Sequence, residues 1–248
     1  MKTIMITGCS SGFGLDIARY FLDRQWRVIA TMRAPREDIL PASERLRVVP
    51  LDVTKAAGIE QSVATAGPID VLVNNAGIGF LNPLEGTPMA TARDVFETNT
   101  LGTIAMTRAV LPQMRERKSG VIVNVTSSVT LKSLPLLSVY TASKAAVNAF
   151  TESLAFELQP FGIRAVLVLP GRAPQTKFGD NARARMQDGF PEPYKAIVEG
   201  VFAGWQKDSL TTDSRAVTEA VWRAATDPSC PMRVPAGADA EALFASAK

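Results

Sequence analysis

Three residues with phenol, amine and hydroxyl side chains have a spacing that can support proton transfer. Tyr140 and Lys144 are four residues apart in SVYTASKAAVNAF, and Ser127 precedes Tyr140 by thirteen positions. A phenol has an unperturbed pKa of about 10, so a tyrosine that transfers protons near neutral pH needs a nearby cation to stabilise its phenolate. On a helix, positions i and i+4 share one face, which brings Lys144 within reach of Tyr140. The spacing therefore predicts an acid/base pair; the alternative is an amphipathic helix with a solvated lysine.

A glycine-rich segment near the N-terminus has the spacing of a phosphate-binding turn. Its glycines follow a GxxxGxG pattern in TGCSSGFG, after a short apolar run and before a helical pattern. Such a turn exposes backbone N–H groups and directs a helix N-terminus, whose macrodipole favours anions, toward a diphosphate. We therefore predict a dinucleotide site, against the alternative of a tight turn without a ligand. The residues expected to contact the cofactor here are Gly8, Ser10, Ser11, Gly12, Phe13 and Gly14.

The end of the second apolar run indicates which cofactor is bound. An acidic residue about 20 positions after the glycines usually binds the ribose 2′-hydroxyl of NAD, whereas an arginine accommodates the 2′-phosphate of NADP. This region carries Met32 and Arg33 and no carboxylate, which predicts NADP(H) over NAD(H); the alternative is a surface arginine. Further along, Asp52 beside Val53 can accept a hydrogen bond from the adenine amino group. Equally, Asp52 can help to begin a helix with Thr54 as N-cap.

Short β-rich runs alternate with helical patterns along most of the chain. Strands are predicted at 3–7, 27–32, 47–51, 69–74, 120–126, 163–169 and 231–234. Helices are predicted at 13–24, 55–65, 89–117, 139–158 and 213–226. Runs such as VIVNV and RAVLVL are almost continuous in aliphatic residues, which is typical of strands buried on both faces of a parallel sheet. The alternation predicts an α/β fold, a Rossmann-like doubly wound parallel sheet flanked by helices, as a single domain over residues 1–248.

Glycine and small polar residues collect where four of the predicted strands end, in TGCSSGFG, NNAG, TSS and PG. Small residues let a ligand approach the backbone closely. Doubly wound sheets bind their ligands beyond the carboxyl ends of the strands. The four strand ends are therefore predicted to form one ligand-binding edge.

Composition limits the remaining function classes. The chain has 248 residues, 46% of them hydrophobic, and its net charge of +3 is dispersed, which gives little support for a nucleic-acid partner. The lack of histidine excludes His-based triads and His-ligated metals, and Cys9 and Cys230 lack metal or disulfide spacing, so no metal site is expected. The longest strictly apolar run, Ala165 to Leu169, is far shorter than the roughly 18 residues of a membrane span. We expect a cytoplasmic protein without a membrane partner.

Seven motifs occur in an order and at separations that resemble the short-chain dehydrogenase/reductase family, in its compact single-domain branch. They are TGCSSGFG, LDVT, NNAG, NTLG, Ser127, YTASK and PG, and the likeness covers residues 3–176. The resemblance implies that Tyr140 exchanges a proton with a carbonyl or alcohol oxygen while a hydride moves to or from the nicotinamide. It implies that Lys144 lowers the Tyr140 pKa and binds the nicotinamide ribose, and that Ser127 binds the substrate oxygen. Asn99 would hold a water of the proton relay; its alternative role is a buried amide that satisfies backbone groups.

The same resemblance implies further cofactor contacts and a substrate lid. Besides Tyr140 and Lys144, the implied contacts are Asn75, Ala76, Gly77, Pro170, Gly171 and Thr176. PGRAPQT carries one residue more than the usual spacing in the family, so the role of Thr176 stays open. A lid is implied at about 172–210, the least regular part of the chain, where aromatic residues could line an apolar pocket and arginines could meet a carboxylate.

The resulting hypothesis is an NADP(H)-dependent oxidoreductase acting on a small-molecule carbonyl or alcohol. A homodimer or homotetramer is implied, built on the long helices that carry Asn99 and Tyr140. Two alternatives remain: a non-catalytic NADP-binding regulatory or scaffold protein, and an isomerase, epimerase or dehydratase on the same scaffold. The complete Ser, Tyr, Lys and Asn set argues against the first, because such a protein could lose the set without losing its fold.

Overall fold

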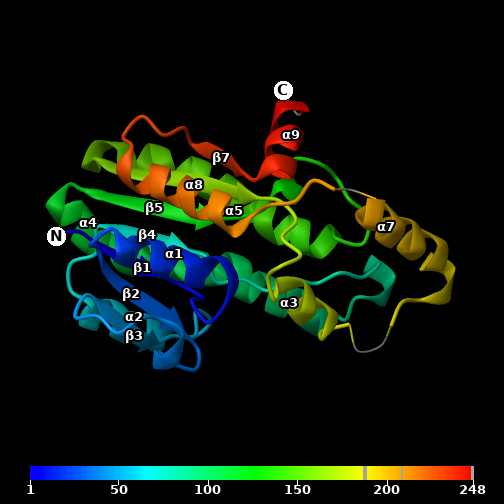
Figure 1. The fold of residues 1–248 in the computed structure, drawn as a ribbon, viewed down its shortest axis with the longest axis horizontal. Coiled ribbons are helices and arrows are strands. Elements are labelled where there is room, and N and C mark those ends of the chain that lie inside the picture. Colours follow the sequence, from blue (N-terminus) through cyan, green and yellow to red (C-terminus); the bar gives the residue numbers. More distant parts are fainter. Residues whose placement is uncertain (187–188, 208, 247–248) are drawn as a thin grey trace.

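The centre of the molecule is a seven-stranded sheet in which all neighbouring strands are parallel, in the order β3-β2-β1-β4-β5-β6-β7 (Figure 1). The computed structural model describes residues 1–186, 189–207 and 209–246. The strands are β1 (Thr3–Ile6), β2 (Arg27–Met32), β3 (Leu46–Pro50), β4 (Val71–Asn74), β5 (Gly120–Val125), β6 (Ile163–Pro170) and β7 (Arg233–Ala236). The chain builds outward from β1 to one edge and then from β4 to the other, which confirms the predicted doubly wound, Rossmann-like sheet.

Helices connect the strands and cover both faces of the sheet. They are α1 (Gly12–Asp23), α2 (Ala56–Ala66), α3 (Met89–Phe96), α4 (Gly102–Arg117), α5 (Ser138–Leu158), α6 (Phe178–Arg183), α7 (Lys195–Lys207), α8 (Ser214–Thr226) and α9 (Ala238–Ser246). The helix predicted at 89–117 is formed by α3 and α4, joined by a π-helical turn at Glu97–Leu101. The sequence did not predict α6, α7 and α9. The helices α6 and α9 are short, and glycines in α6 and α7 lower the intrinsic helix propensity.

Side chains of β1 alternate between two buried cores, one on each face of the sheet. Ile4 belongs to the core that α1 covers with Phe21, whereas Met5 belongs to the core that α4 and α5 cover with Met106 and Leu154. Each of these side chains is at least nine-tenths buried. A sheet covered on both faces presents only its edges and strand ends to ligands, so the carboxyl ends are the place for a site.

Residues 172–210, here called the lid segment, lie beyond the carboxyl ends of the strands and include α6 and α7 (Figure 1). Residues 187–188 and 208 of this segment lie outside the described residues. The sequence marked this segment as the least regular part of the chain, and two helices form in it. Its apolar residues Val198 and Phe202 pack with Leu81 and Leu136, from the loops that follow β4 and β5. This small separate core positions the lid segment over the strand ends.

Candidate active site

A cavity of about 830 Å³ lies at the carboxyl edge of the sheet. It brings together almost all of the residues predicted for the site, although they come from widely separated parts of the chain. Those that line it are Gly8, Ser10, Ser11, Gly12, Phe13, Arg33, Asp52, Val53, Asn75, Ala76, Gly77, Ser127, Tyr140, Lys144, Pro170, Gly171 and Thr176. Only Gly14 and Asn99, among the predicted residues, do not line the cavity. Both contact residues that do.

The glycine loop between β1 and α1 forms one wall of the cavity. Gly8 and Gly12 have φ angles of +76° and +57°, which side-chain-bearing residues rarely adopt. A Cβ atom on Gly14 would collide with the Gly8 carbonyl oxygen and lie 2.5 Å from Asn75 Nδ2, so α1 can begin here only without a side chain. Ser11 precedes α1 without forming a side-chain cap, which leaves the first N–H groups of the helix available to an anion.

Thr7 and Asn75 tie the glycine loop to the loop that follows β4. Asn75 Nδ2 donates hydrogen bonds to the carbonyl oxygens of Thr7 and Gly8, at 2.9 and 3.2 Å. The Thr7 hydroxyl accepts the backbone N–H groups of Asn75 and Ala76, both at 3.0 Å. The sequence did not single out this role of Thr7. The sequence feature that could have indicated this role is a short hydroxyl side chain at the strand end, directly before the first glycine.

Arg33 and Asp52 define the end of the cavity at which the resemblance to the family implies the adenosine. Thr54 donates to Asp52 Oδ1 through its N–H at 3.0 Å and its hydroxyl at 2.8 Å. Burial alone would raise the Asp52 pKa, but these hydrogen bonds and the charges of Arg33 and Lys55 lower it below its ordinary value. Thr54 was offered as a helix N-cap, which is wrong: α2 begins at Ala56, after Lys55, because the Thr54 hydroxyl is engaged by Asp52.

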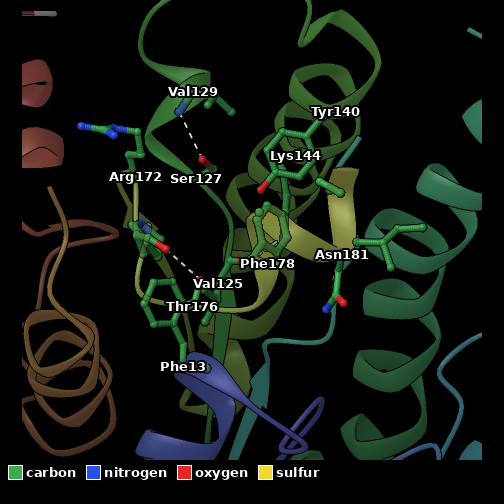
Figure 2. Close-up of a pocket in the computed structure, with 18 of the residues that line it drawn as sticks. Phe13, Val125, Ser127, Val129, Tyr140, Lys144, Arg172, Thr176, Phe178 and Asn181 are labelled. Atoms are coloured by element: carbon green, nitrogen blue, oxygen red, sulfur yellow. Dashed lines mark hydrogen bonds between the residues drawn. The ribbon is translucent and has the colours of Figure 1, made fainter. Parts of the chain in front are cut away.

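Ser127, Tyr140 and Lys144 form the floor of the cavity, here called the catalytic floor. Ser127 follows β5, and α5 carries both Tyr140 and Lys144 on its buried side, with exposed fractions of 7% and 5%. Lys144 Nζ donates to the Val125 carbonyl oxygen at 3.0 Å. Figure 2 shows the Tyr140 hydroxyl turned toward Ser127, on the same side of the cavity. The three side chains therefore line the same cavity.

The expected lowering of the Tyr140 pKa by Lys144 stays a prediction, because other influences on that pKa are larger in this structure. Burial raises the Tyr140 pKa well above its ordinary value, and the opposing influence is a hydrogen bond with Ser127 rather than the lysine charge. Burial also lowers the pKa of Lys144 to about 8, because a desolvated ammonium is costly. Tyr140 is thus held as the neutral phenol, the form that can give up a proton to an oxygen acceptor.

Asn99 lies in the π-helical turn between α3 and α4 and is fully buried. Its Oδ1 accepts the Ile78 N–H at 2.8 Å, and its Nδ2 donates to the Ile78 carbonyl and to Ser143 Oγ, both at 3.0 Å. These bonds match the alternative role, a buried amide that satisfies backbone groups. A Cβ on Gly77 would lie 3.2 Å from Asn99 Oδ1 and 3.3 Å from Lys144 Nζ, so Asn99 positions the loop beside the lysine.

A chain of buried amides and hydroxyls beneath the catalytic floor was not predicted. Asn74 Nδ2 donates to Thr107 Oγ1 at 3.0 Å and to Asn124 Oδ1 at 2.8 Å. Asn124 Nδ2 donates in turn to Thr151 Oγ1 at 2.8 Å, on α5. The chain links β4, β5, α4 and α5. Asparagines within otherwise aliphatic strands were the signal for it, since buried polar groups need partners.

The turn after β6 is held by hydrogen bonds to two residues that lie outside the predicted motifs. The Gly171 N–H donates to Thr212 Oγ1 at 2.8 Å, and the Arg172 N–H donates to Asp239 Oδ2 at 2.6 Å. Thr212 Oγ1 is 2.7 Å from Asp239 Oδ1. Thr176 bonds to the Ala173 carbonyl just after this turn, and its methyl group lies 3.7 Å from where a Cβ of Gly12 would be. Thr212 and Asp239 are distant in sequence, so no local pattern marks them.

The lid segment reaches the catalytic floor through Phe178. The Phe178 and Tyr140 ring centroids are 5.7 Å apart, and Figure 2 shows the two rings facing the same space. On its other side the Phe178 ring contacts Gly79, where a Cβ would lie 2.7 Å from Phe178 Cε1. The sequence placed Phe178 in the lid without assigning it a position. Its contact with Tyr140 places it where a substrate would meet the phenol.

The fold and the cavity define a class of protein. A parallel doubly wound sheet with a glycine loop at its first crossover is suited to a dinucleotide, and the catalytic floor adds a phenol, a hydroxyl and an amine. This combination is that of a dinucleotide-binding α/β protein equipped for proton transfer. The chain belongs to the short-chain dehydrogenase family, whose family model, described as short chain dehydrogenase, matches residues 2–187.

Curated relatives and solved structures agree with this family. Retinol dehydrogenase 8 of Homo sapiens is 40% identical over 181 residues, covering 68% of this chain and 58% of that protein. 3-Ketodihydrosphingosine reductase of Bacteroides thetaiotaomicron is 33% identical over 255 residues, covering 100% of this chain and 92% of the relative. The alignment thus spans somewhat more than half of the human protein, but nearly all of the bacterial one.

Among solved structures, a short-chain dehydrogenase from Streptomyces avermitilis is 35% identical, with a TM-score of 0.85, covering 99% of this chain and 91% of that one. A short-chain dehydrogenase from Burkholderia cenocepacia in complex with NADP is 27% identical, with a TM-score of 0.79, covering 99% and 94%. A nicotinamide cofactor is therefore supported.

Two features are absent from the described residues. No helix among them is long and apolar enough to cross a membrane. Within the same residues, no group of three or more Cys, Asp or Glu side chains is arranged to hold a metal ion.

Proposed function

We propose that this protein is an NADP(H)-dependent oxidoreductase that interconverts a carbonyl compound and an alcohol. The observation that carries the proposal is the meeting of Ser127, Tyr140 and Lys144 in one cavity with the glycine loop. The membership of the family supports it, because its relatives include a named dehydrogenase and a named reductase.

The residues present fit a bound dinucleotide. The helix N-terminus after Gly12 can receive the diphosphate, and Gly8 leaves room for close approach of the backbone. Arg33 is exposed at the end of β2 and supports NADP(H) over NAD(H), since a guanidinium matches a phosphate. The cofactor, when bound, supplies or accepts the hydride.

The side chains of this protein would then handle the proton and the oxygen atom. Ser127 would bind the substrate oxygen beside Tyr140, and the neutral Tyr140 phenol would give its proton to that oxygen in the direction of reduction. Lys144, with Asn99 in the relay, would restore the proton. Reversal of each step gives alcohol oxidation.

The cavity supports an apolar substrate. Leu81, Leu137 and Trp205 are among its lining residues, and Phe178 lies against the acid/base residue. The retinol and 3-ketodihydrosphingosine named for two relatives are lipids, which agrees with an apolar lining. We propose a carbonyl or alcohol group carried on a largely apolar molecule, with the lid segment enclosing it.

A screen of carbonyl compounds and alcohols with NADPH and NADH, followed by nicotinamide absorbance, tests the proposed function. The Tyr140→Phe variant should lower kcat by about 10²–10⁴-fold and leave the Kd of NADPH within about twofold. Tyr20→Phe, at a tyrosine outside the cavity, is the matched control and should not change turnover. Tight binding of cofactor without turnover of any compound would favour a regulatory or scaffold protein instead.

We further propose a homo-oligomer assembled through α4 and α5. Phe156 on α5 is 78% exposed, and Leu101, just before α4, is 50% exposed. Apolar residues in such positions are typical of an interface between subunits. A monomeric mass in sedimentation at micromolar concentration would contradict this.

A further inference from the structure

Two arginines from different parts of the chain line the same cavity, and the charge of one acts on the other. Arg33 follows β2, and Arg185 follows α6 in the lid segment. The lid segment is seated here by the contact of Phe178 and Ala182 with Gly79, where an added Cβ would lie 2.7 Å and 3.1 Å from the two side chains. Phe178 and Ala182 therefore hold this part of the lid segment against the loop after β4. Arg185, three residues after Ala182, lines the cavity as a result.

Carboxylates lie near both arginines, but neither arginine is closely paired with one that the structure describes. Burial lowers the Arg185 pKa, as does the nearby charge of Arg33, whereas Asp94 on α3 opposes both. Asp52 also faces Arg33, whose charge helps to lower the Asp52 pKa. Within the described residues, no carboxylate oxygen lies within 4.0 Å of either guanidinium. Two like charges thus share a region without a paired anion.

The Arg185 guanidinium uses only some of its hydrogen-bond donors within the described part of the chain. Its Nη1 donates to the Asn181 carbonyl oxygen at 2.6 Å, which fixes the side chain against α6. Its Nε and Nη2 have no hydrogen bond to the described part of the chain. Arg183, two residues earlier, differs: its side chain is 70% exposed and pairs with Asp180 at 3.6 Å. A guanidinium held at one nitrogen and open at the others suits a phosphate, which accepts several N–H donors.

We propose that Arg185 joins Arg33 in binding the 2′-phosphate of NADP(H), so that a residue of the lid segment takes part in the choice of cofactor. The inference rests on the proposed use of NADP(H). A dianionic phosphate between the two guanidiniums would relieve their mutual repulsion. Binding of the 2′-phosphate and the contacts that hold the lid segment in its present position would then favour each other.

Calorimetric titration with two cofactor fragments tests this without catalysis. Adenosine 2′,5′-bisphosphate carries the 2′-phosphate, and adenosine 5′-monophosphate lacks it. In Arg185→Ala, the Kd of the bisphosphate should rise about tenfold, with the monophosphate affected less than about twofold. Arg185→Lys, which keeps the charge but loses the fork of donors, should fall between wild type and Arg185→Ala. Lys195→Ala is the matched control: it removes one positive charge from the same segment, does not line the cavity, and should keep wild-type affinities.

The outcomes separate this inference from the proposed cofactor preference. If Arg33→Ala loses discrimination between the fragments while Arg185→Ala keeps it, the role of Arg185 is overturned and the NADP(H) preference stands. Equal weakening of both fragments in Arg185→Ala, or an equal loss in Lys195→Ala, also overturns it. If the wild type binds both fragments alike, both proposals fail.

Discussion

The catalytic floor and the lid segment differ in the burial and the bonding partners of their polar side chains. Beside the floor, Lys144 and Asn99 are buried, and their side chains bond to backbone or side chains of other elements. In the lid segment, Arg183 pairs with Asp180 of its own helix, and both stay largely exposed. Leaving a buried polar group without a partner costs about 1–3 kcal/mol, whereas exposed pairs contribute about 0–1 kcal/mol. The floor is therefore fixed in one arrangement, and the lid segment can change its contacts at low cost.

The largest expected effect comes from Lys144→Met in the catalytic floor, where function and stability should change in opposite directions. Loss of the ammonium should lower kcat by about 10²–10⁴-fold, because it removes the proposed relay and ribose contact. The same change should raise the free energy of unfolding at pH 7. Burial lowers the Lys144 pKa from 10.5 to about 8, a cost of about 3 kcal/mol. Loss of its hydrogen bond to Val125 offsets about 1 kcal/mol, which leaves roughly 2 kcal/mol.

The pH dependence of that gain identifies its cause. Between the folded pKa of about 8 and the ordinary value of 10.5, the unfolded chain holds the Lys144 proton and the folded chain releases it. Stability of the wild type relative to Lys144→Met therefore rises with pH across this window. Urea unfolding at pH 7 and pH 9.5 measures the difference. If the difference in unfolding free energy between the two proteins stays constant with pH, burial does not lower the Lys144 pKa.

The two regions also differ in how far the sequence predicts them. The glycine loop and the Tyr140–Lys144 pair lie in contiguous motifs, whose spacing alone determines a turn or a helix face. The bond between Asn74 and Asn124 depends on β4 lying beside β5 in a register that pairs these residues, which no local pattern states. In the lid segment, α7 forms where apolar side chains meet Leu81 and Leu136. Such tertiary contacts override weak intrinsic propensity.

A pair of glycine substitutions compares the packing of the glycine loop with that of the lid segment. Gly14→Ala places a methyl group against the Gly8 carbonyl and Asn75, which belong to a hydrogen-bonded loop and cannot easily move. It should destabilise the protein by about 1–3 kcal/mol and weaken NADPH binding. Gly200→Ala, within α7, meets nothing within 4 Å and should leave stability unchanged or raise it by up to about 1 kcal/mol. Equal midpoints of urea unfolding for the two variants would remove the proposed difference in packing.

The smallest expected effect lies where the two regions touch. Gly79→Ala places a methyl group 2.7–2.8 Å from two atoms of the Phe178 ring, which belongs to a side chain able to rotate. The ring should shift toward Tyr140 and narrow the space for substrate. We expect the KM of the best carbonyl substrate to rise about threefold, with the Kd of NADPH and the unfolding free energy close to those of the wild type.

A double-mutant cycle shows whether this effect passes through Phe178. Phe178→Ala removes the ring that the new methyl group meets, so Gly79→Ala should change KM little in that background, although Ala182 lies 3.1 Å from the same point. A fall in kcat for Gly79→Ala that persists without the Phe178 ring would mean that the substitution disturbs the loop beside Asn99 instead. The cycle would then show that Gly79 acts through the rigid residues beside the catalytic floor. Loss of the KM effect in the double variant would place it with the adaptable lid segment, because only a side chain that can move transmits the change at so low a cost.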